Sequence, residues 1–242
     1  MAVRGWELAC LLAWLVGLWL VVRNGARPYL LGLFCGASAL AMWDWITNDI
    51  WLWNITADER FFDLFTVAGR TELLWAPFSY GFFYAIPTVL AVRHRAGLDQ
   101  RLGAWQYVVI PVALGFSDIL IEGISVGWLG LYDFAYKTSY EWWGVPWTNI
   151  VFIAVSQVPI LFLARRVGDV CALANLPTVE APRRELAAVG RGGNPAPATV
   201  PAADSRWHWA PFWMALMVCP TGLYVAAWFS ALWLERLDPF LR

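Results

Sequence analysis

Val108-Val-Ile-Pro-Val-Ala-Leu-Gly-Phe-Ser-Asp118-Ile-Leu-Ile-Glu122-Gly decides how this chain folds, because it is a long apolar helix candidate that contains two carboxylates. Asp118 and Glu122 are four residues apart, so both lie on one face of a helix. Charged groups within apolar spans are rare, usually face the protein interior and by default suggest a functional site. Because two neighbouring negative charges repel, we expect one of the pair to hold a proton near neutral pH.

The composition of the whole chain predicts an integral membrane protein. Of the 242 residues, 60% are hydrophobic and 14% are charged. The mean hydropathy is +0.54. A soluble domain of this size carries about a quarter charged residues. The net charge of −1 argues against nucleic acid as a partner.

Six apolar stretches approach the roughly 20 residues that a helix needs to cross a bilayer. The predicted spans are residues 6–22, 28–46, 71–92, 104–127, 147–164 and 209–234. We therefore predict an all-α fold, a polytopic membrane bundle of about six, or seven, transmembrane helices.

One segment has a different composition from the spans. Residues 168–206 are rich in Pro, Ala, Gly and Arg and poor in aromatic residues, which predicts a disordered loop. The chain then divides into a transmembrane bundle of five spans at 1–167, this loop, and a final transmembrane helix at 207–242.

The distribution of positive charge predicts the orientation in the membrane. Eleven of the 17 Lys and Arg residues fall on the side of the long loop, which the positive-inside rule places in the cytoplasm. The N-terminus would then lie outside, or in the lumen, of a bacterial inner membrane or the endoplasmic reticulum. Five of the eleven lie in the loop region itself, and without them each side holds six.

Tryptophan is unusually abundant, with 18 residues. Trp favours membrane interfaces, and an interfacial belt is one explanation. Half of the Trp residues, however, fall within 43–75 and 128–147, whereas two belts would spread them more evenly. This clustering predicts that some of them line a pocket.

A first candidate acid lies at the end of the second predicted span. Asp44 stands between Trp43 and Trp45, so a carboxylate lies beside indole rings that can stabilise a cation. The alternative is an interfacial belt with solvated acids.

A second candidate acid, Glu72, lies at the start of the third predicted span, before Trp75 and Tyr80. The alternative for Glu72 is an acid in the first turn of a helix, where the helix dipole favours negative charge.

The sequence predicts no metal and no cofactor. The two His and four scattered Cys residues form no metal-binding spacing. Asn48 and Asp49 could begin a magnesium motif for a diphosphate, but the carboxylates that such a motif needs do not follow at regular spacing. No phosphate-binding loop or dinucleotide fingerprint is present.

The residues after Glu122 predict a break in the helix. Gly123, Gly127 and Gly130 permit a close backbone approach, and irregular backbone at membrane depth survives where it is buried or lines a cavity. We expect aromatic side chains to face this cavity. The candidates are Trp128, Tyr132 and Tyr136. The alternative for the carboxylate pair is a purely structural hydrogen-bonded contact between helices.

The order Glu122-Gly-x-x-x-Gly-x-x-Gly-x-Tyr-x-x-x-Tyr136, followed by Gly144-Val-Pro, resembles the core motif of the carotenoid biosynthesis membrane-protein family. This family includes bisanhydrobacterioruberin hydratase, which adds water to terminal double bonds. In size and in its buried Glu and Asp, the chain is also similar to the small membrane-integral terpene cyclases of meroterpenoid and indole-diterpene pathways. By that resemblance the acids would be Asp44 or Glu72 from one half and Asp118 or Glu122 from the other.

Both resemblances imply one chemistry on a lipophilic isoprenoid substrate held within membrane lipid. A buried acid protonates an olefin or epoxide, aromatic faces hold the carbocation, and a carboxylate removes a proton or positions water. The candidates for holding the cation are Trp43, Trp45, Trp75, Tyr80, Trp128, Tyr132, Tyr136 and Trp143. We expect a terpene cyclase, with a carotenoid hydratase as the alternative. A different class, a proton-coupled transporter or lipid-binding membrane protein, also stays open.

Overall fold

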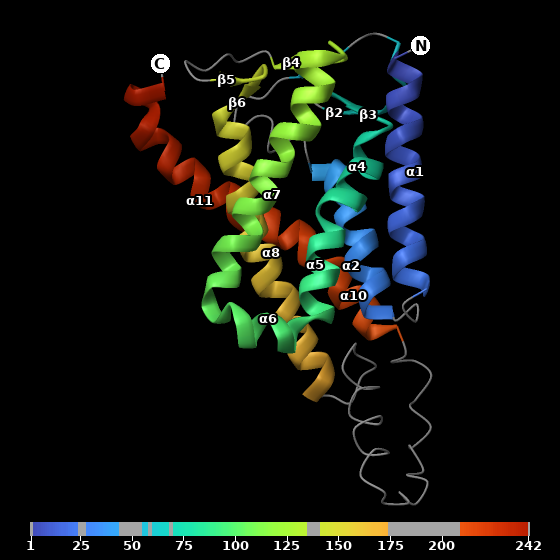
Figure 1. Cartoon of the computed structure of the whole chain (residues 1–242), viewed down its shortest axis with the longest axis vertical. Coiled ribbons are helices and arrows are strands. Elements are labelled where there is room, and N and C mark those ends of the chain that lie inside the picture. Colours follow the sequence, from blue (N-terminus) through green and yellow to red (C-terminus); the bar gives the residue numbers. More distant parts are fainter. Residues whose placement is uncertain are drawn as a thin grey trace, which may run out of the picture.

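The structure of the protein is a computed structural model that describes residues 2–23, 28–43, 55–57, 60–67, 70–134, 141–173 and 209–241, and it is mostly helical (Figure 1). The helices are α1 (Ala2–Arg23), α2 (Pro28–Ser38), η1 (Ala39–Trp43), α4 (Ala76–Phe83), α5 (Ala85–Arg93), α6 (Arg95–Arg101), η2 (Gly103–Trp105), α7 (Gln106–Glu122), η3 (Gly123–Trp128), α8 (Trp147–Leu173), α10 (Ala210–Leu216) and α11 (Val218–Leu241). The strands are β1 (Ile55–Ala57), β2 (Asp63–Val67), β3 (Arg70–Leu73), β4 (Tyr132–Phe134), β5 (Glu141–Trp142) and β6 (Val145–Pro146).

The helices form a bundle whose two ends differ (Figure 1). The strands gather at one end, where α1 begins and α7 ends, whereas α6 lies at the opposite end. Within the bundle, α2 packs against α10, and α8 packs against both α7 and α11.

Four helical stretches among the described residues are long and apolar enough to cross a membrane. They are Ala2–Arg23, Gly103–Trp128, Asn149–Cys171 and Ala210–Phe229. Pro28–Met42 is apolar but shorter. The predicted stretch at 71–92 is not one helix at all. The expectation of six or seven spans is therefore not confirmed.

Prolines explain why two predicted spans are divided. Pro87 has no N–H to donate to the carbonyl of Phe83, and the helix is interrupted at Tyr84, between α4 and α5. Pro220 likewise cannot donate to the carbonyl of Leu216, where α10 ends.

Two further expectations need correction. The third predicted span begins with a strand, so Glu72 lies on β3 opposite Phe65 and not in the first turn of a helix. Helix α8, which contains the fifth predicted span, continues to Leu173 and therefore includes the first residues of the loop predicted at 168–206. The rest of that loop lies outside the described residues.

The fold is also not purely α-helical. Three two-stranded antiparallel sheets join β1 to β4, β2 to β3 and β5 to β6. Each strand is two to five residues long. Such short segments contain too few residues for an alternation of apolar and polar side chains to be detected in the sequence.

Helix α2 passes through the core, and its close packing depends on glycine. Tyr29 and Phe34 are fully buried. A Cβ atom on Gly32 would lie 2.3 Å from the carbonyl oxygen of Phe212, and one on Gly36 would lie 2.4 Å from that of Leu216. This spacing of two glycines four residues apart lets the backbones of α2 and α10 touch.

Several helices have apolar faces that the protein does not cover. In α1 only Val3, Cys10, Gly17 and Val21 are buried, while Leu8 and Trp19 are about half exposed. A helix that is apolar on its exposed side as well as its packed side is typical of a membrane environment.

Candidate functional site

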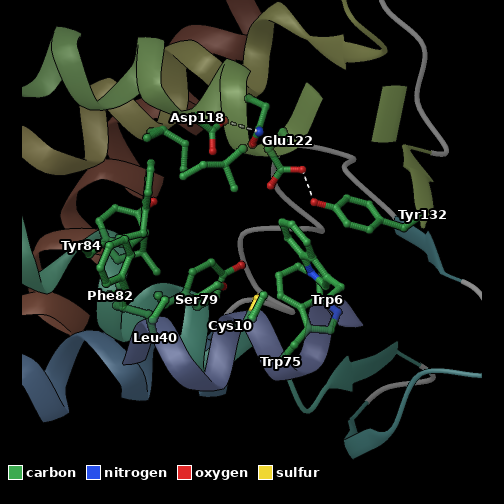
Figure 2. A pocket seen from close by; sticks show the side chains of 18 of the residues that line it. Trp6, Cys10, Leu40, Trp75, Ser79, Phe82, Tyr84, Asp118, Glu122 and Tyr132 are labelled. Carbon is green, nitrogen blue, oxygen red and sulfur yellow. Dashed lines mark hydrogen bonds between the residues drawn. The ribbon is translucent and has the colours of Figure 1, made fainter. Parts of the chain in front are cut away.

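A cavity of about 270 Å³ lies within the bundle toward its strand end (Figure 2). Ligand sites for small molecules start at about this volume. Helices α1, η1, α4, α7, α8 and α11 and strand β4 contribute to its wall, together with Trp75 and Tyr84, which flank α4. The lining residues are Trp6, Ala9, Cys10, Ala13, Leu40, Trp75, Ser79, Tyr80, Phe82, Phe83, Tyr84, Asp118, Ile121, Glu122, Tyr132, Phe134, Asn149, Ile153 and Leu223.

Asp118 and Glu122 both line this cavity from α7 (Figure 2). Asp118 is only 4% exposed, and the side-chain amide of Asn149 on α8 donates a 2.8 Å hydrogen bond to its Oδ2. The shared face predicted from the i, i+4 spacing is therefore present, and it is directed toward a cavity rather than toward lipid.

Tyr132 forms a hydrogen bond with the second carboxylate, that of Glu122. Its hydroxyl donates to Oε2 of Glu122 and accepts a 2.8 Å hydrogen bond from Ser125. Burial, together with the nearby Glu122 carboxylate, raises the pKa of Tyr132 well above its usual value. The phenol therefore keeps its proton and remains a donor to Glu122.

The helix break predicted after Glu122 places Tyr132. Residues 123–128 form a π-helix, Gly130 has a φ of +58°, and Leu131 donates a backbone hydrogen bond to Ser125. Because the wider π turn and the glycine reverse the chain, β4 returns alongside the end of α7. Tyr132 then reaches the carboxylate ten residues earlier.

Part of the cavity wall is aromatic. Trp75 stacks on Tyr132 with 5.5 Å between ring centroids and 20° between planes. Trp6 meets Trp75 edge to face at 6.0 Å. Rings in such contacts hold one another in place, so the cavity combines fixed aromatic faces with two carboxyl groups.

The hairpin of β5 and β6 covers the outside of the π-helix. Trp143, which has a φ of +58°, packs so closely on Gly123 and Gly127 that a Cβ on either glycine would lie 2.6 Å or less from it. The close approach that the glycines predicted is thus made by Trp143, which itself does not line the cavity.

The structure brings together only part of the predicted site. Trp75, Tyr80 and Tyr132 line the cavity with the two carboxylates. Trp128 is 76% exposed and Trp143 is 57% exposed, so the expectation that they belong to the site in the cavity is wrong. Trp143 packs on Gly123 and Gly127 of the π-helix instead, and the side chain of Trp128 is largely exposed.

The remaining candidates are placed differently. Glu72 is buried on β3 but is not among the residues that line the cavity. Trp43 ends η1, and its side chain is not described. Asp44, Trp45, Tyr136, Asn48 and Asp49 lie outside the described residues.

Sequence reasoning missed the contribution of the first helix. Trp6, Ala9, Cys10 and Ala13 recur at spacings of three and four residues and form one face of α1 toward the cavity. The small residues Ala9 and Ala13 on the same face as Trp6 could have indicated that this face packs against the protein interior. Asn149, a lone amide in an apolar helix, was a second one.

Comparisons with models of protein families, with curated proteins and with solved structures found no match to this chain. The resemblance to isoprenoid-modifying membrane enzymes therefore stays a prediction.

Proposed function

We propose that the protein is an integral-membrane enzyme that modifies an isoprenoid olefin or epoxide by acid-initiated, metal-independent cyclisation through a carbocation. The observation that supports this proposal best is a cavity lined by two carboxyl groups and several aromatic rings. An acid, a base and cation-stabilising surfaces are what such a reaction requires.

Glu122 is the proton donor in this proposal. Its Oε2 accepts the hydrogen bond from Tyr132, so the transferred proton is carried by Oε1. Transfer of this proton to an olefin carbon uses the π electrons of the double bond and leaves a carbocation on the neighbouring carbon. A second double bond of the substrate attacks that cation, which closes the ring.

Asp118 is the base that ends the reaction. Asn149 engages Oδ2 and holds the carboxylate in the cavity wall. Removal of a proton from the carbon beside the final cation leaves the C–H electron pair as a new double bond. Return of that proton to Glu122, one helical turn away, restores the starting state. If water reaches the cation first and Asp118 takes its proton, the product is an alcohol and the enzyme is a hydratase.

The aromatic wall would stabilise the intermediate. A cation over the face of Trp, Tyr or Phe gains about 0.5–2 kcal/mol, with the higher values in desolvated sites. Trp75 is 6% exposed and Tyr84 is 3% exposed, so bulk water has little access to either ring. Exclusion of water also protects the cation from premature capture.

One feature favours a second candidate function, a proton-coupled transporter. Buried polar groups connect α8 to Tyr84 in the cavity wall and to α5: the Tyr84 and Ser156 hydroxyls are 3.4 Å apart, and Gln157 donates to Thr88 at 3.0 Å. Proton relays in transporters use titratable Asp, Glu or His residues. Because these four residues include no Asp, Glu or His, we favour the enzyme.

Product analysis tests the proposal directly. Expression in a host that makes polyprenyl olefins and epoxides should yield a new cyclic hydrocarbon or alcohol, detected by mass spectrometry against the empty vector. If no isoprenoid changes, and reconstituted vesicles instead show substrate-dependent proton uptake, the transporter is the better explanation.

A pair of Trp substitutions tests which indoles contact the cation. Trp75→Phe should lower the rate about two- to thirtyfold, or change the product ratio, since a smaller ring loses part of a contact of this strength. Trp128→Phe is the matched control and should have little effect, because this indole is 76% exposed and lies outside the cavity. Product yield and product ratio for both variants are the measurement. The reverse pattern would contradict the assignment of the cavity.

We also propose six membrane crossings, with the segment that follows α8 cytoplasmic and both termini on the other side. Four crossings are supported by helix length and composition. Reporter fusions after residues 100, 140 and 190 should place positions 100 and 190 on one side and position 140 on the other. A fusion at 140 that shares a side with the other two contradicts this topology.

A further inference from the structure

A second cavity, of about 280 Å³, lies at the end of the bundle opposite the carboxylate pair, between α6, the start of α7 and the end of α8. Three arginines, Arg95, Arg165 and Arg166, and two aspartates, Asp99 and Asp169, line it. We call it the arginine cavity. Gln106 at its wall and Glu122 are at opposite ends of α7, about 24 Å apart by helix rise, so this is a separate site.

The positive charges of the arginine cavity are only partly compensated. Arg95 pairs with Asp169 and lies 3.5 Å from Asp99, and Nη1 of Arg165 donates to Asp99 at 2.7 Å. Burial opposes ionisation of Asp99, but hydrogen bonds from Gln106 and Arg165 outweigh it and hold the pKa of this carboxyl below its usual value. Arg166 has no acidic partner among the described residues, which leaves the cavity with a net positive charge.

Two buried polar groups in the wall are unsatisfied. Arg165 is only 5% exposed, yet its Nε and Nη2 have no hydrogen-bond partner among the described residues. Oε1 of Gln106, which is 2% exposed, also has none, while its Nε2 donates to Asp99 and to the carbonyl of Gly103. Buried polar groups, and guanidinium groups above all, are normally paired. The wall thus offers N–H donors to an anion and one acceptor to a hydroxyl.

The position of the cavity suggests where such an anion comes from. The apolar stretch Gly103–Trp128 begins here, and Asn149–Cys171 ends here. In a membrane this end of the bundle lies at the depth of the lipid headgroups, where basic pockets between helices bind anionic phosphates.

We propose that the arginine cavity binds the phosphate of an anionic phospholipid headgroup that also carries a hydroxyl, with Arg165 and Arg166 contacting the phosphate oxygens and Gln106 accepting from the hydroxyl. Arginine suits this role because its planar group can donate two hydrogen bonds to one phosphate. The site is independent of the proposed isoprenoid chemistry.

Lipid retention by the purified full-length protein tests the site. The protein is reconstituted with phosphatidylglycerol or with phosphatidylcholine, and retained lipid is counted by native mass spectrometry. We expect one tightly held phosphatidylglycerol, and retention about fivefold weaker in Arg166→Gln, which removes one exposed cation. Arg165→Gln should lose the lipid. Arg101→Gln, an exposed arginine on α6 that does not line the cavity, is the matched control and should behave as the wild type.

Further arms separate the possible outcomes. If Arg165→Gln does not fold, Arg166→Gln still decides the question, because this side chain is exposed. If inorganic phosphate raises the melting temperature as much as phosphatidylglycerol does, and no lipid is retained, the ligand is a soluble phosphate and the lipid assignment is overturned. If neither phosphate nor lipid distinguishes the wild type from Arg166→Gln, the cavity is a structural ion-pair network and the proposal is wrong.

Discussion

Glu122→Gln should abolish the formation of a new isoprenoid product while leaving expression and folding near normal. Gln keeps the size of the side chain and can still accept the hydrogen bond from Tyr132, but its amide cannot supply a proton as a carboxylic acid does. Loss of a general acid typically costs about 10²–10⁴-fold in rate, and more when the acid begins the reaction. Product yield in the polyprenyl-making host, normalised to purified protein, is the measurement.

Two variants complete that experiment. Asp133→Asn is the matched control, because Asp133 lies beside Tyr132 on β4 but is exposed and does not line the cavity. Asp118→Asn should reduce yield as much as Glu122→Gln, because Asp118 is the proposed base; a clearly smaller loss would mean that Asp118 only tunes its neighbour. Wild-type yield from Glu122→Gln would mean that the acid lies elsewhere, with Glu72 and Asp44 as the next candidates.

Gly36→Val should destabilise the whole bundle. A Cβ atom at this position would lie 2.4 Å from the carbonyl oxygen of Leu216, a backbone atom that cannot move aside cheaply. Overpacking of this kind costs about 1–3 kcal/mol, and more when backbone must shift. We therefore expect a clearly lower melting temperature for the detergent-solubilised protein, or failure to accumulate in the membrane.

Gly5→Val is the matched control for this substitution. It places the same side chain in the helix α1, where a Cβ atom would meet nothing within 4 Å. Its effect should be limited to the small difference in helix propensity. Equal melting temperatures for Gly36→Val and Gly5→Val would show that α2 and α10 do not approach as closely as described.

The sequence predicted the features of the site that depend on local spacing. A separation of four residues puts Asp118 and Glu122 on one face whatever surrounds the helix. The run of glycines after Glu122 predicted a local break, which is the π-helix at 123–128. Both follow from backbone geometry within one or two turns, and for this reason they needed no knowledge of the other helices.

The direction of the aromatic side chains did not follow from the sequence. Trp75 and Trp128 were both expected to face the cavity site, yet Trp75 is 6% exposed in the cavity wall and Trp128 is 76% exposed outside it. An indole packs equally well against protein and at a membrane interface. Whether an indole side chain points into the protein or toward the membrane therefore depends on which helix packs beside it.

The chain alone determined that this is a mostly helical protein with long apolar helices and a costly pair of carboxylates in one of them. Only the tertiary structure decided what encloses that pair: the small-residue face of α1 with Trp6, the amide of Asn149 from α8, and Tyr132 returning on β4. Helix α1 is more than a hundred residues from β4 and from α8 in the chain. The contacts that bring them together depend on packing between helices, such as the contact of Gly36 with Leu216, and the sequence does not specify which helix packs against which.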